Sequence, residues 1–351
     1  MGSGGEAGDH QKGFRLQFLT REAYGWHYLI ENERNNGTGG HGIKNAAYAG
    51  GSSSMKNKTI MAVPTGCFFG VIAVCIIGIM LGSFRDFDIN VALANKTDFG
   101  AFIATYGSYF SYCLYPAAGA CLYVGLKAKG DRFRLLAWVL LLLGCFMAVY
   151  YSNSYNGKAV RALFGYTAGD SGAFLSVLSW LFWAVLYAWV PFVVIRLLDH
   201  ADPDKLIAVG AAILVAGIAA DNVNLWLKQV ASRPRYKYLI TLENPASEYR
   251  NWWQMIPNLA GSNDNFKSWP SGNMTIASMM FSLPMLTDAM KNRSSRKNMI
   301  AFIIACLFVA LYGYNRIHMT NHFLSDVCFG TLITYIIYTV ISTAFLKAAE
   351  K

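Results

Sequence analysis

The chain has 351 residues, of which 54% are hydrophobic and only 14% are charged. This composition excludes an ordinary soluble domain, because the apolar residues come in runs of about 20, the length that crosses a bilayer. The net charge of +10 does not indicate a nucleic-acid partner, since no basic face with interleaved aromatic residues accompanies it. Seven cysteines lie in or beside the apolar runs without a CxxC pair. We therefore expect buried small side chains and neither a disulfide framework nor a zinc site.

Residues 1–54 differ from everything that follows. They are rich in glycine and end in a Gly/Ser stretch directly before Met55. We interpret them as an expression tag and linker, or alternatively as a disordered N-terminal tail, and leave them out of the functional argument. Two further regions are predicted: N-terminal transmembrane helices in residues 55–204 and a catalytic transmembrane region in residues 205–351.

Eight apolar runs follow, and each is interpreted as a membrane span. They cover residues 64–82, 104–126, 134–152, 173–197, 205–227, 274–289, 298–315 and 327–347. Lys and Arg residues concentrate in the loops on one side, among them residues 127–134 and 291–297, so this side is predicted to be cytoplasmic. The sequence thus predicts an all-α polytopic protein of a plasma or inner membrane, with its other face outside the cytoplasm.

The long loop between the fifth and sixth runs begins and ends with polar groups. It opens with Lys228, Arg233 and Arg235 and closes with Pro-Ser-Gly-Asn at residues 270–273, directly before the next run. This closing segment predicts a helix N-terminus, where free backbone N–H groups favour an anion. Each residue also has a structural alternative: Lys228 as a snorkelling side chain, Ser271 as an N-cap and the arginines as a basic loop.

Another polar group lies between the last two apolar runs and contains Arg316, His318, His322 and Asp326. His322 and Asp326 are four residues apart and would share one face of a helix. The carboxylate would then hold one imidazole nitrogen and leave the other free to attack or to shuttle a proton. Arg316 offers a planar fork of donors to an oxyanion. The alternative is an interfacial cluster in which the basic side chains snorkel and Asp326 caps the last helix.

Together these groups resemble the signature of the type 2 phosphatidic acid phosphatase (PAP2) superfamily of membrane lipid phosphatases. The family pattern is Lys-x6-Arg-Pro, then Pro-Ser-Gly-His, then Ser-Arg-x5-His-x3-Asp. The segments here, in the same order, are Lys228-x6-Arg235-Tyr236, Pro270-Ser271-Gly272-Asn273 and Asn315-Arg316-x5-His322-x3-Asp326. The resemblance implies a PAP2-like helical bundle. Because eight predicted spans exceed the six usual in the family, they would comprise a six-helix core and extra N-terminal spans.

The resemblance also implies roles for individual residues. His322 would attack phosphorus to form a phosphohistidine, and Asp326 would orient it. The groups that would hold the phosphoryl oxygens are Lys228, Arg235, Arg316, the Ser271 hydroxyl and the Gly272 amide, with Arg233 as a secondary candidate. Since cations and amides do this work, the resemblance implies no metal and no other cofactor.

Asn273 is the departure that matters most, because the family's His at this position protonates the leaving oxygen and an amide cannot. Tyr236 and Asn315 also depart from the pattern, but neither needs to touch phosphorus. Three explanations stay open. A diphosphate substrate would need little protonation, because its leaving group is a stable phosphate anion. In the second explanation, His318 supplies the proton; its alternative is a merely interfacial side chain. In the third, the chain is catalytically disabled, as a natural pseudoenzyme or as a deliberate His-to-Asn variant.

The sequence therefore predicts a phosphatase that removes phosphate from a lipid phosphate or a polyprenyl diphosphate at the extracytoplasmic face of the membrane. A lipid phosphotransferase would use the same residues, whereas a vanadate-haloperoxidase-like enzyme is disfavoured by the bilayer spans. From a different class, a non-catalytic lipid-phosphate-binding or transport protein is the alternative. His322 with Asp326 argues against it, and Asn273 argues for it. The expected partners are the lipid substrate and the bilayer, with no prediction of oligomeric state.

Overall fold

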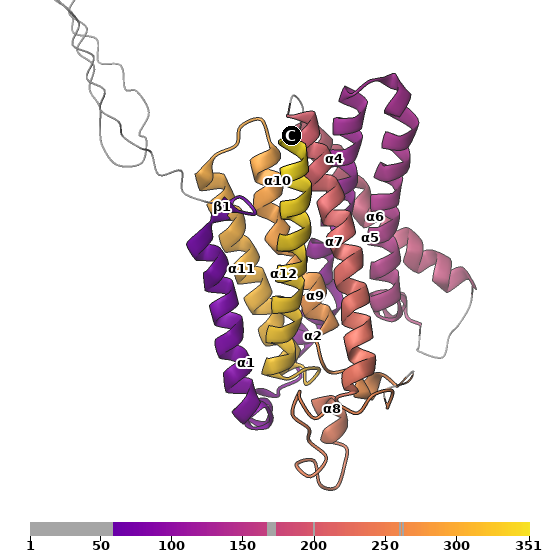
Figure 1. Ribbon diagram of the computed structural model, residues 1–351. Coiled ribbons are helices and arrows are strands. Elements are labelled where there is room, and N and C mark those ends of the chain that lie inside the picture. The colour runs from indigo at the N-terminus through magenta and orange to yellow at the C-terminus, as the bar shows by residue number, and fades with distance from the viewer. Residues whose placement is uncertain (1–58, 167–172, 199–200, 260, 262) are drawn as a thin grey trace, which may run out of the picture. The chain divides into compact units, whose positions relative to one another are not determined.

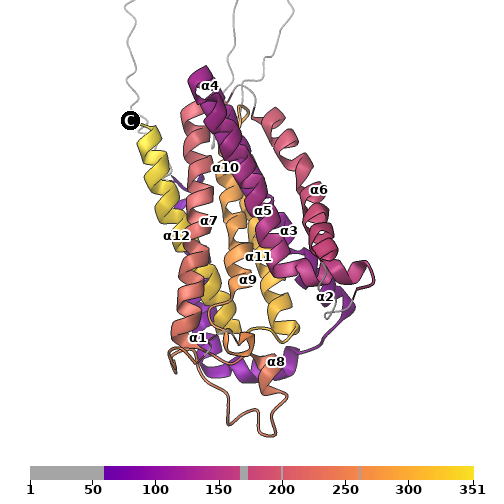
Figure 2. The ribbon, with the colours of Figure 1, turned by 90° about the vertical axis from the view of Figure 1, so that its right-hand side faces the viewer.

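The computed structural model describes residues 59–166, 173–198, 201–259, 261 and 263–351. The predicted N-terminal tail lies outside these residues. The described part is almost entirely helical (Figures 1 and 2), as the sequence predicts. Its one small sheet pairs β1 (Thr59–Ile60) with β2 (Val63–Pro64) in antiparallel fashion, just before the first helix.

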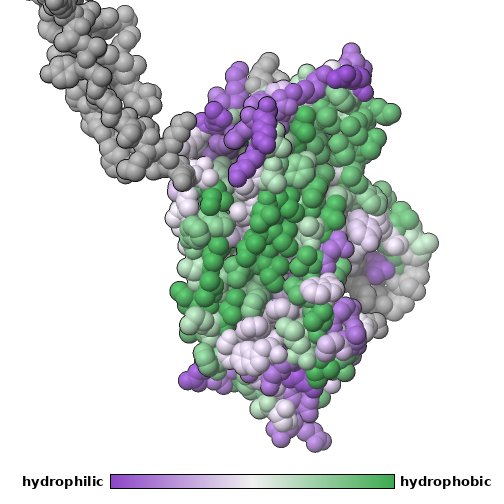
Figure 3. Space-filling view, in the orientation of Figure 1, coloured by the Kyte–Doolittle hydropathy of each residue, from purple (hydrophilic) through white to green (hydrophobic). Residues whose placement is uncertain are grey.

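Six helices in the described part are long and apolar enough to cross a membrane. They are α1 (Thr65–Leu93), α5 (Arg134–Leu163), α6 (Ala173–Leu197), α7 (Pro203–Ala231), α11 (Ser295–His318) and α12 (Leu324–Ala349). Many of their large apolar side chains point outward, among them Phe84, Leu135 and Val185, each more than 70% exposed. Figure 3 shows the result as a green apolar belt between purple polar ends. Such a belt belongs in lipid, so the chain is an integral membrane protein.

The prediction of eight continuous spans is not confirmed. The run at 104–126 forms α2 (Asp98–Tyr106), α3 (Ser108–Tyr112) and α4 (Leu114–Ala128), and the run at 274–289 forms α9 (Gly272–Ser278), a 3-10 turn (Met279–Ser282) and α10 (Leu283–Ala289). At about 1.5 Å per residue, the 15-residue α4 rises about 22 Å, less than the bilayer core. Both segments are largely buried by neighbouring helices. Broken helices are tolerated there because protein groups satisfy the backbone.

The ends of α7 and α11 and the starts of α9 and α12 lie in one region, toward the bottom of Figure 1. Helix α7 ends at Ala231, and the left-handed φ of 44° at the next residue, Ser232, turns the chain away from the helix axis. The loop that follows contains α8 (Tyr236–Leu239) and a 3-10 turn (Asp264–Phe266), and it returns to the start of α9. A further 3-10 turn (Asp131–Phe133) lies at the opposite end, before α5. The short link between α11 and α12, residues 319–323, lies beside the long loop. The Lys237 N–H of the loop donates to the Thr320 carbonyl of the link at 2.9 Å.

Candidate active site

His322, the predicted nucleophile, lies in the link between α11 and α12 and is 1% exposed. Its Nδ1 lies 2.8 Å from the carbonyl oxygen of Ser268. A carbonyl only accepts, so Nδ1 carries the proton in this bond and Nε2 keeps its lone pair. Nε2 is buried and has no hydrogen-bond partner among the residues that the structure describes. The ring is therefore held in the tautomer that a nucleophilic imidazole needs.

Asp326 does not hold the imidazole directly. The closest approach, from His322 Nδ1 to Asp326 Oδ2, is 4.0 Å, longer than a hydrogen bond. Instead Oδ2 accepts from the Ser268 hydroxyl at 2.6 Å and from the Phe323 N–H at 2.9 Å. The Ser268 carbonyl accepts the hydrogen bond from His322 Nδ1, so Ser268 connects the Asp326 carboxylate to the imidazole ring. Asp326 therefore contacts the Ser268 segment and not the imidazole itself.

Arg233 lies on the other side of Asp326 and is 2% exposed. Its guanidinium donates to Asp326 Oδ1 at 2.6 Å and to Asp86 Oδ2 at 3.0 Å, and it also donates to Ser325 Oγ. Both carboxylates are fully buried. The guanidinium also lies over the ring of Phe323, 4.3 Å from its centroid. With the bond from its Nε to the Arg250 carbonyl, all three guanidinium nitrogens of Arg233 donate to protein groups.

The three cations predicted to bind phosphate surround His322. Lys228 Nζ donates to the carbonyls of Pro270 and Lys267 at 2.6 and 2.9 Å. Arg235 donates to Asp264 Oδ1 at 2.7 Å. Arg316 differs from both, because its Nε and Nη2 are buried without a hydrogen-bond partner in the described part of the chain. A buried guanidinium with open donors is costly unless an anion completes its shell.

The partner of Arg235 is a surface carboxylate. Asp264 is 61% exposed on its side chain and also accepts from Lys237 at 3.0 Å. Partial burial would raise its pKa, but Arg235 and the hydrogen bond from Lys237 outweigh burial and lower it. Asp264 therefore stays ionised at neutral pH and holds Arg235 at the rim, where an incoming phosphate would compete with it.

The Pro-Ser-Gly-Asn segment lies beside Lys228. The Ser271 hydroxyl does not cap α9; it is fully buried and unpartnered within the described residues, while the Ser271 N–H donates to the Asp326 carbonyl at 3.0 Å. A Cβ on Gly272 would come within 3.1 Å of Asn224 Oδ1 and 3.4 Å of Lys228 Cε, so a larger residue here would press on Lys228. Asn273 follows and is half-buried.

His318 is directed away from this arrangement. Its Nδ1 lies 2.9 Å from the carbonyl oxygen of Leu93, at the end of α1, and its ring stacks on Tyr314 with centroids 5.4 Å apart. His318 thus links α11 to α1. The structure brings the other predicted residues together around His322 and leaves His318 outside.

The electrostatic setting of His322 follows from these positions. Burial is the largest of the causes that lower the pKa of His322 well below its usual range. The positive charges of Arg235, Lys228 and Arg316 lower it further. The neutral, nucleophilic imidazole is therefore the dominant form through neutral and mildly acidic pH.

We expect this shift to appear in the pH dependence of any turnover at the site. Activity is lost as falling pH protonates Nε2, so the acid limb of kcat/KM that reports His322 should lie below pH ~6.5, the ordinary imidazole value. Arg316→Gln removes one positive neighbour, which favours the protonated ring and should move this limb to higher pH. An acid limb centred above pH ~6.5 in the unaltered protein would contradict the lowered pKa.

Residues 205–350 match the sequence model of the PAP2 superfamily. This C-terminal stretch belongs to the PAP2 superfamily. The matched stretch contains Lys228 and every other residue of the three motif segments, and it leaves α1 to α6 outside. Together with the six spanning helices, this membership supports a membrane protein of phosphatase type. The chain matched no curated protein and no solved structure.

The PAP2 match does not contain all of the residues that build the site. Asp86, on α1, accepts from the Ser325 N–H at 3.0 Å as well as from the Ser325 hydroxyl and Arg233. Asn90, one turn further along, donates to the His322 carbonyl at 3.2 Å. Sequence reasoning missed both residues. The available signal was an aspartate inside an apolar helix, which is expensive in a membrane and marks a partner or a site.

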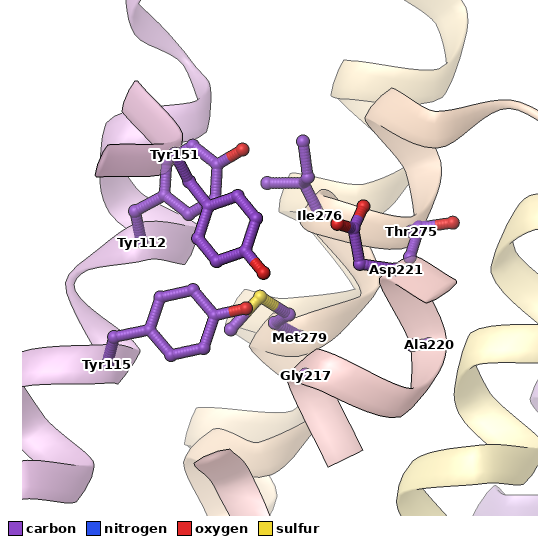
Figure 4. A pocket seen from close by; sticks show the side chains of 9 residues that line it. All are labelled: Tyr112, Tyr115, Tyr151, Gly217, Ala220, Asp221, Thr275, Ile276 and Met279. Carbon is purple, nitrogen blue, oxygen red and sulfur yellow. The ribbon is translucent and has the colours of Figure 1, made fainter. Parts of the chain in front are cut away.

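A small cavity lies beside α7, about two turns before Lys228 (Figure 4). Its volume of about 10 Å³ is close to the least that holds one water molecule. Tyrosine rings, among them Tyr112 and Tyr115, line one side, and Asp221 lines the other. Asp221 and Lys228 are seven residues apart and share a face of α7, about 10 Å apart along its axis. This cavity is therefore separate from the cluster around His322.

Proposed function

We propose that this chain hydrolyses a lipid diphosphate, with a polyprenyl diphosphate as the favoured substrate, through a phosphohistidine at His322. One observation carries the proposal. A buried imidazole, held with its Nδ1 proton on Ser268 O and its Nε2 unpartnered, lies among three cations, one of which also has open donors. An unprotonated nucleophile beside cations that stabilise negative oxygens is what phosphoryl transfer chiefly requires of a protein.

In the first step, His322 Nε2 attacks the terminal phosphorus. The N–P bond forms as the bond to the bridging oxygen breaks, and the lipid monophosphate leaves with that oxygen and its electron pair. Lys228, Arg235 and Arg316 balance the charge on the phosphoryl oxygens. The Ser268 carbonyl stabilises the Nδ1 proton as the ring becomes positive. A water molecule then attacks phosphorus, inorganic phosphate leaves, and the neutral imidazole returns.

Asn273 is the reason for favouring a diphosphate over a simple lipid phosphate. Hydrolysis of a phosphate monoester expels an alkoxide, which needs a proton as it leaves. A diphosphate expels a phosphate anion, which does not. The amide of Asn273 donates no proton at neutral pH, and His318 is bonded to the Leu93 carbonyl, away from His322.

We expect Asn273→His to widen the substrate range. A general acid at this position should raise kcat for a lipid monophosphate on the order of a hundredfold and change turnover of the diphosphate little. Phosphate release from both lipids in detergent measures this, with Asn273→Gln as a control that alters size without adding an acid. Equal gains on both substrates would contradict the leaving-group argument.

A second candidate function is binding of a lipid phosphate without turnover, and Asn273 is the observation that favours it. A disabled PAP2 protein would bind the diphosphate and release no phosphate until Asn273→His restores activity. A phosphotransferase would instead pass the phosphoryl group to a lipid hydroxyl, and product analysis in the presence of acceptor lipids separates it from a hydrolase.

The proposed site faces away from the cytoplasm. This part of the proposal is supported by the loops at the opposite end, which carry the larger share of Lys and Arg, including the loop before α5 and the loop between α10 and α11. The substrate phosphate would therefore be removed at the outer leaflet.

A further inference from the structure

A long apolar groove of about 760 Å³ lies between α1, α11 and α12. Its walls include Gly70 and Val74 of α1, Val309 and Gly313 of α11, and Leu324 of α12. Figure 1 shows α1 running beside α11 and α12 over most of its length. None of the lining residues is charged. A groove of this volume and character suits a hydrocarbon ligand.

The groove exists because of how α1 is packed. α1 packs closely on α12 and only sparsely on α11. Two glycines one turn apart allow the close side: a Cβ on Gly78 would meet Cys328 Sγ at 2.4 Å, and a Cβ on Gly82 would meet the Ser325 nitrogen at 2.8 Å. Because α1 packs against α12 at these two glycines, it does not fill the space between itself and α11.

One end of the groove adjoins the site. Met274, which lines it, follows Asn273 directly, and Ile317, also in its wall, follows Arg316. Leu324 lines the same end and lies two residues after His322. The near end of the groove is therefore lined by residues that lie one or two positions from Asn273, Arg316 and His322 in the chain.

The groove is longer than one leaflet of a bilayer. On α11 it is lined from Phe302 to Ile317, which corresponds to about 23 Å at 1.5 Å per residue. Half of a bilayer core is about 15 Å. A chain that fills the groove therefore extends past the bilayer midplane, which an acyl chain of one leaflet does not.

We propose that this groove binds the hydrocarbon chain of the substrate and that its length selects a long polyprenyl chain. The proposal rests on the function proposed above and assigns the chain-binding surface of the same site. It also gives a role to α1, which lies outside the stretch that matches the PAP2 superfamily. α1 supplies one wall of the groove and, through Asp86, supports the His322 segment, so chain binding and the catalytic arrangement share one helix.

A smaller apolar groove of about 400 Å³ lies on the other side of α11, against α2, α3 and α6. Phe110, Trp183 and Leu311 line it. No residue of α9, the helix that contains Asn273, or of α12, the helix that follows His322, lines it, unlike the larger groove. Occupation of this smaller groove by the chain is the competing outcome that the test must detect.

Gly70 offers a direct test. A Cβ there meets nothing within 4 Å, so Gly70→Phe is not strained at its Cβ and directs a ring toward the groove that Gly70 lines. Gly66 is the matched control: it is on the same helix one turn earlier, has equally open space, and is not part of the groove wall. Phosphate release is measured for Gly70→Phe, Gly66→Phe and the unaltered protein, with undecaprenyl diphosphate and with dimethylallyl diphosphate, whose chain is too short to reach Gly70.

Gly70→Phe should raise KM for undecaprenyl diphosphate on the order of tenfold, equivalent to losing about two buried methylene contacts. Turnover of dimethylallyl diphosphate should be unchanged, and Gly66→Phe should match the unaltered protein on both. An equal loss on both substrates would mean a structural effect and overturn the proposal. An unchanged KM for the long substrate would overturn it as well.

A binding measurement keeps the groove testable if the chain proves to have no turnover. A polyprenyl phosphate with a diazirine near the end of its chain is photolysed with the protein, and labelled peptides are mapped by mass spectrometry. The proposal requires label on the groove faces of α1 and α11, near Val71 and Val309, reduced by Gly70→Phe and not by Gly66→Phe. Label near Phe110 and Trp183 would place the chain in the smaller groove and refute the assignment, whatever the catalytic result.

Discussion

His322→Ala should lower kcat/KM for phosphate release by at least about a thousandfold, because it removes the nitrogen that attacks phosphorus in the proposed mechanism. The three cations would remain, so the variant should still bind a lipid diphosphate. Loss of turnover with retained binding is the pattern of a missing nucleophile, and it is measured by phosphate release alongside equilibrium binding of the substrate.

His318→Ala is the matched control for this loss. It removes the same kind of side chain four residues earlier, at the end of α11, where the ring bonds the Leu93 carbonyl and stacks on Tyr314. A change of no more than a few-fold is expected. A large loss in His318→Ala on monophosphates and diphosphates alike would show that this ring takes part in the chemistry and would contradict its placement outside the site.

Arg233→Leu should strongly destabilise the protein. The substitution leaves the Asp86 and Asp326 carboxylates buried without their shared cation, and breaking a buried ion pair from one side costs about 3–5 kcal/mol. Asp326 would also lose its main restraint, so the Ser268 segment and the ring of His322 should become less well held. Thermal unfolding in detergent, followed by phosphate release from the surviving folded fraction, measures both effects.

Arg235→Leu separates stability from binding. It removes the same side chain two residues later, but the partner it leaves, Asp264, is 61% exposed and is solvated by water. This variant should unfold close to the midpoint of the unaltered protein and bind the diphosphate more weakly. If Arg233→Leu unfolded no earlier than Arg235→Leu, the buried network would not have the structural role described here.

The residues of the candidate site were predictable from the sequence because the motifs are local. Lys228 and Arg235 lie at and just beyond the end of α7, and Arg316, His322 and Asp326 lie where α11 ends and α12 begins. Helix ends and short turns therefore decide their positions. Six of the eight predicted spans are single long apolar helices in the structure, so hydrophobicity alone was enough to identify them. The prediction of a span was not confirmed for the runs at 104–126 and 274–289, because hydrophobicity alone does not separate a spanning helix from broken helices buried inside a bundle.

The contacts that hold the site were not predictable in the same way. Asp86 and Asn90 belong to α1, more than 200 residues before His322 in the chain, and no local pattern links them to it. The four-residue spacing of His322 and Asp326 suggested a direct bond, but His322 precedes the start of α12, so the two do not share a helix face. Ser268 takes the intermediate place, and only the return of the long loop brings it there.

The most direct test of the proposed mechanism is to look for the covalent intermediate. A polyprenyl diphosphate carrying radiolabel in its terminal phosphate is mixed with the protein and quenched in alkali within one turnover. The account predicts a protein-bound label that is stable to alkali, labile to acid, located on the peptide that contains His322 and absent in His322→Ala. Phosphate release at the normal rate with no labelled protein, or label on another residue, would contradict a phosphohistidine at this site.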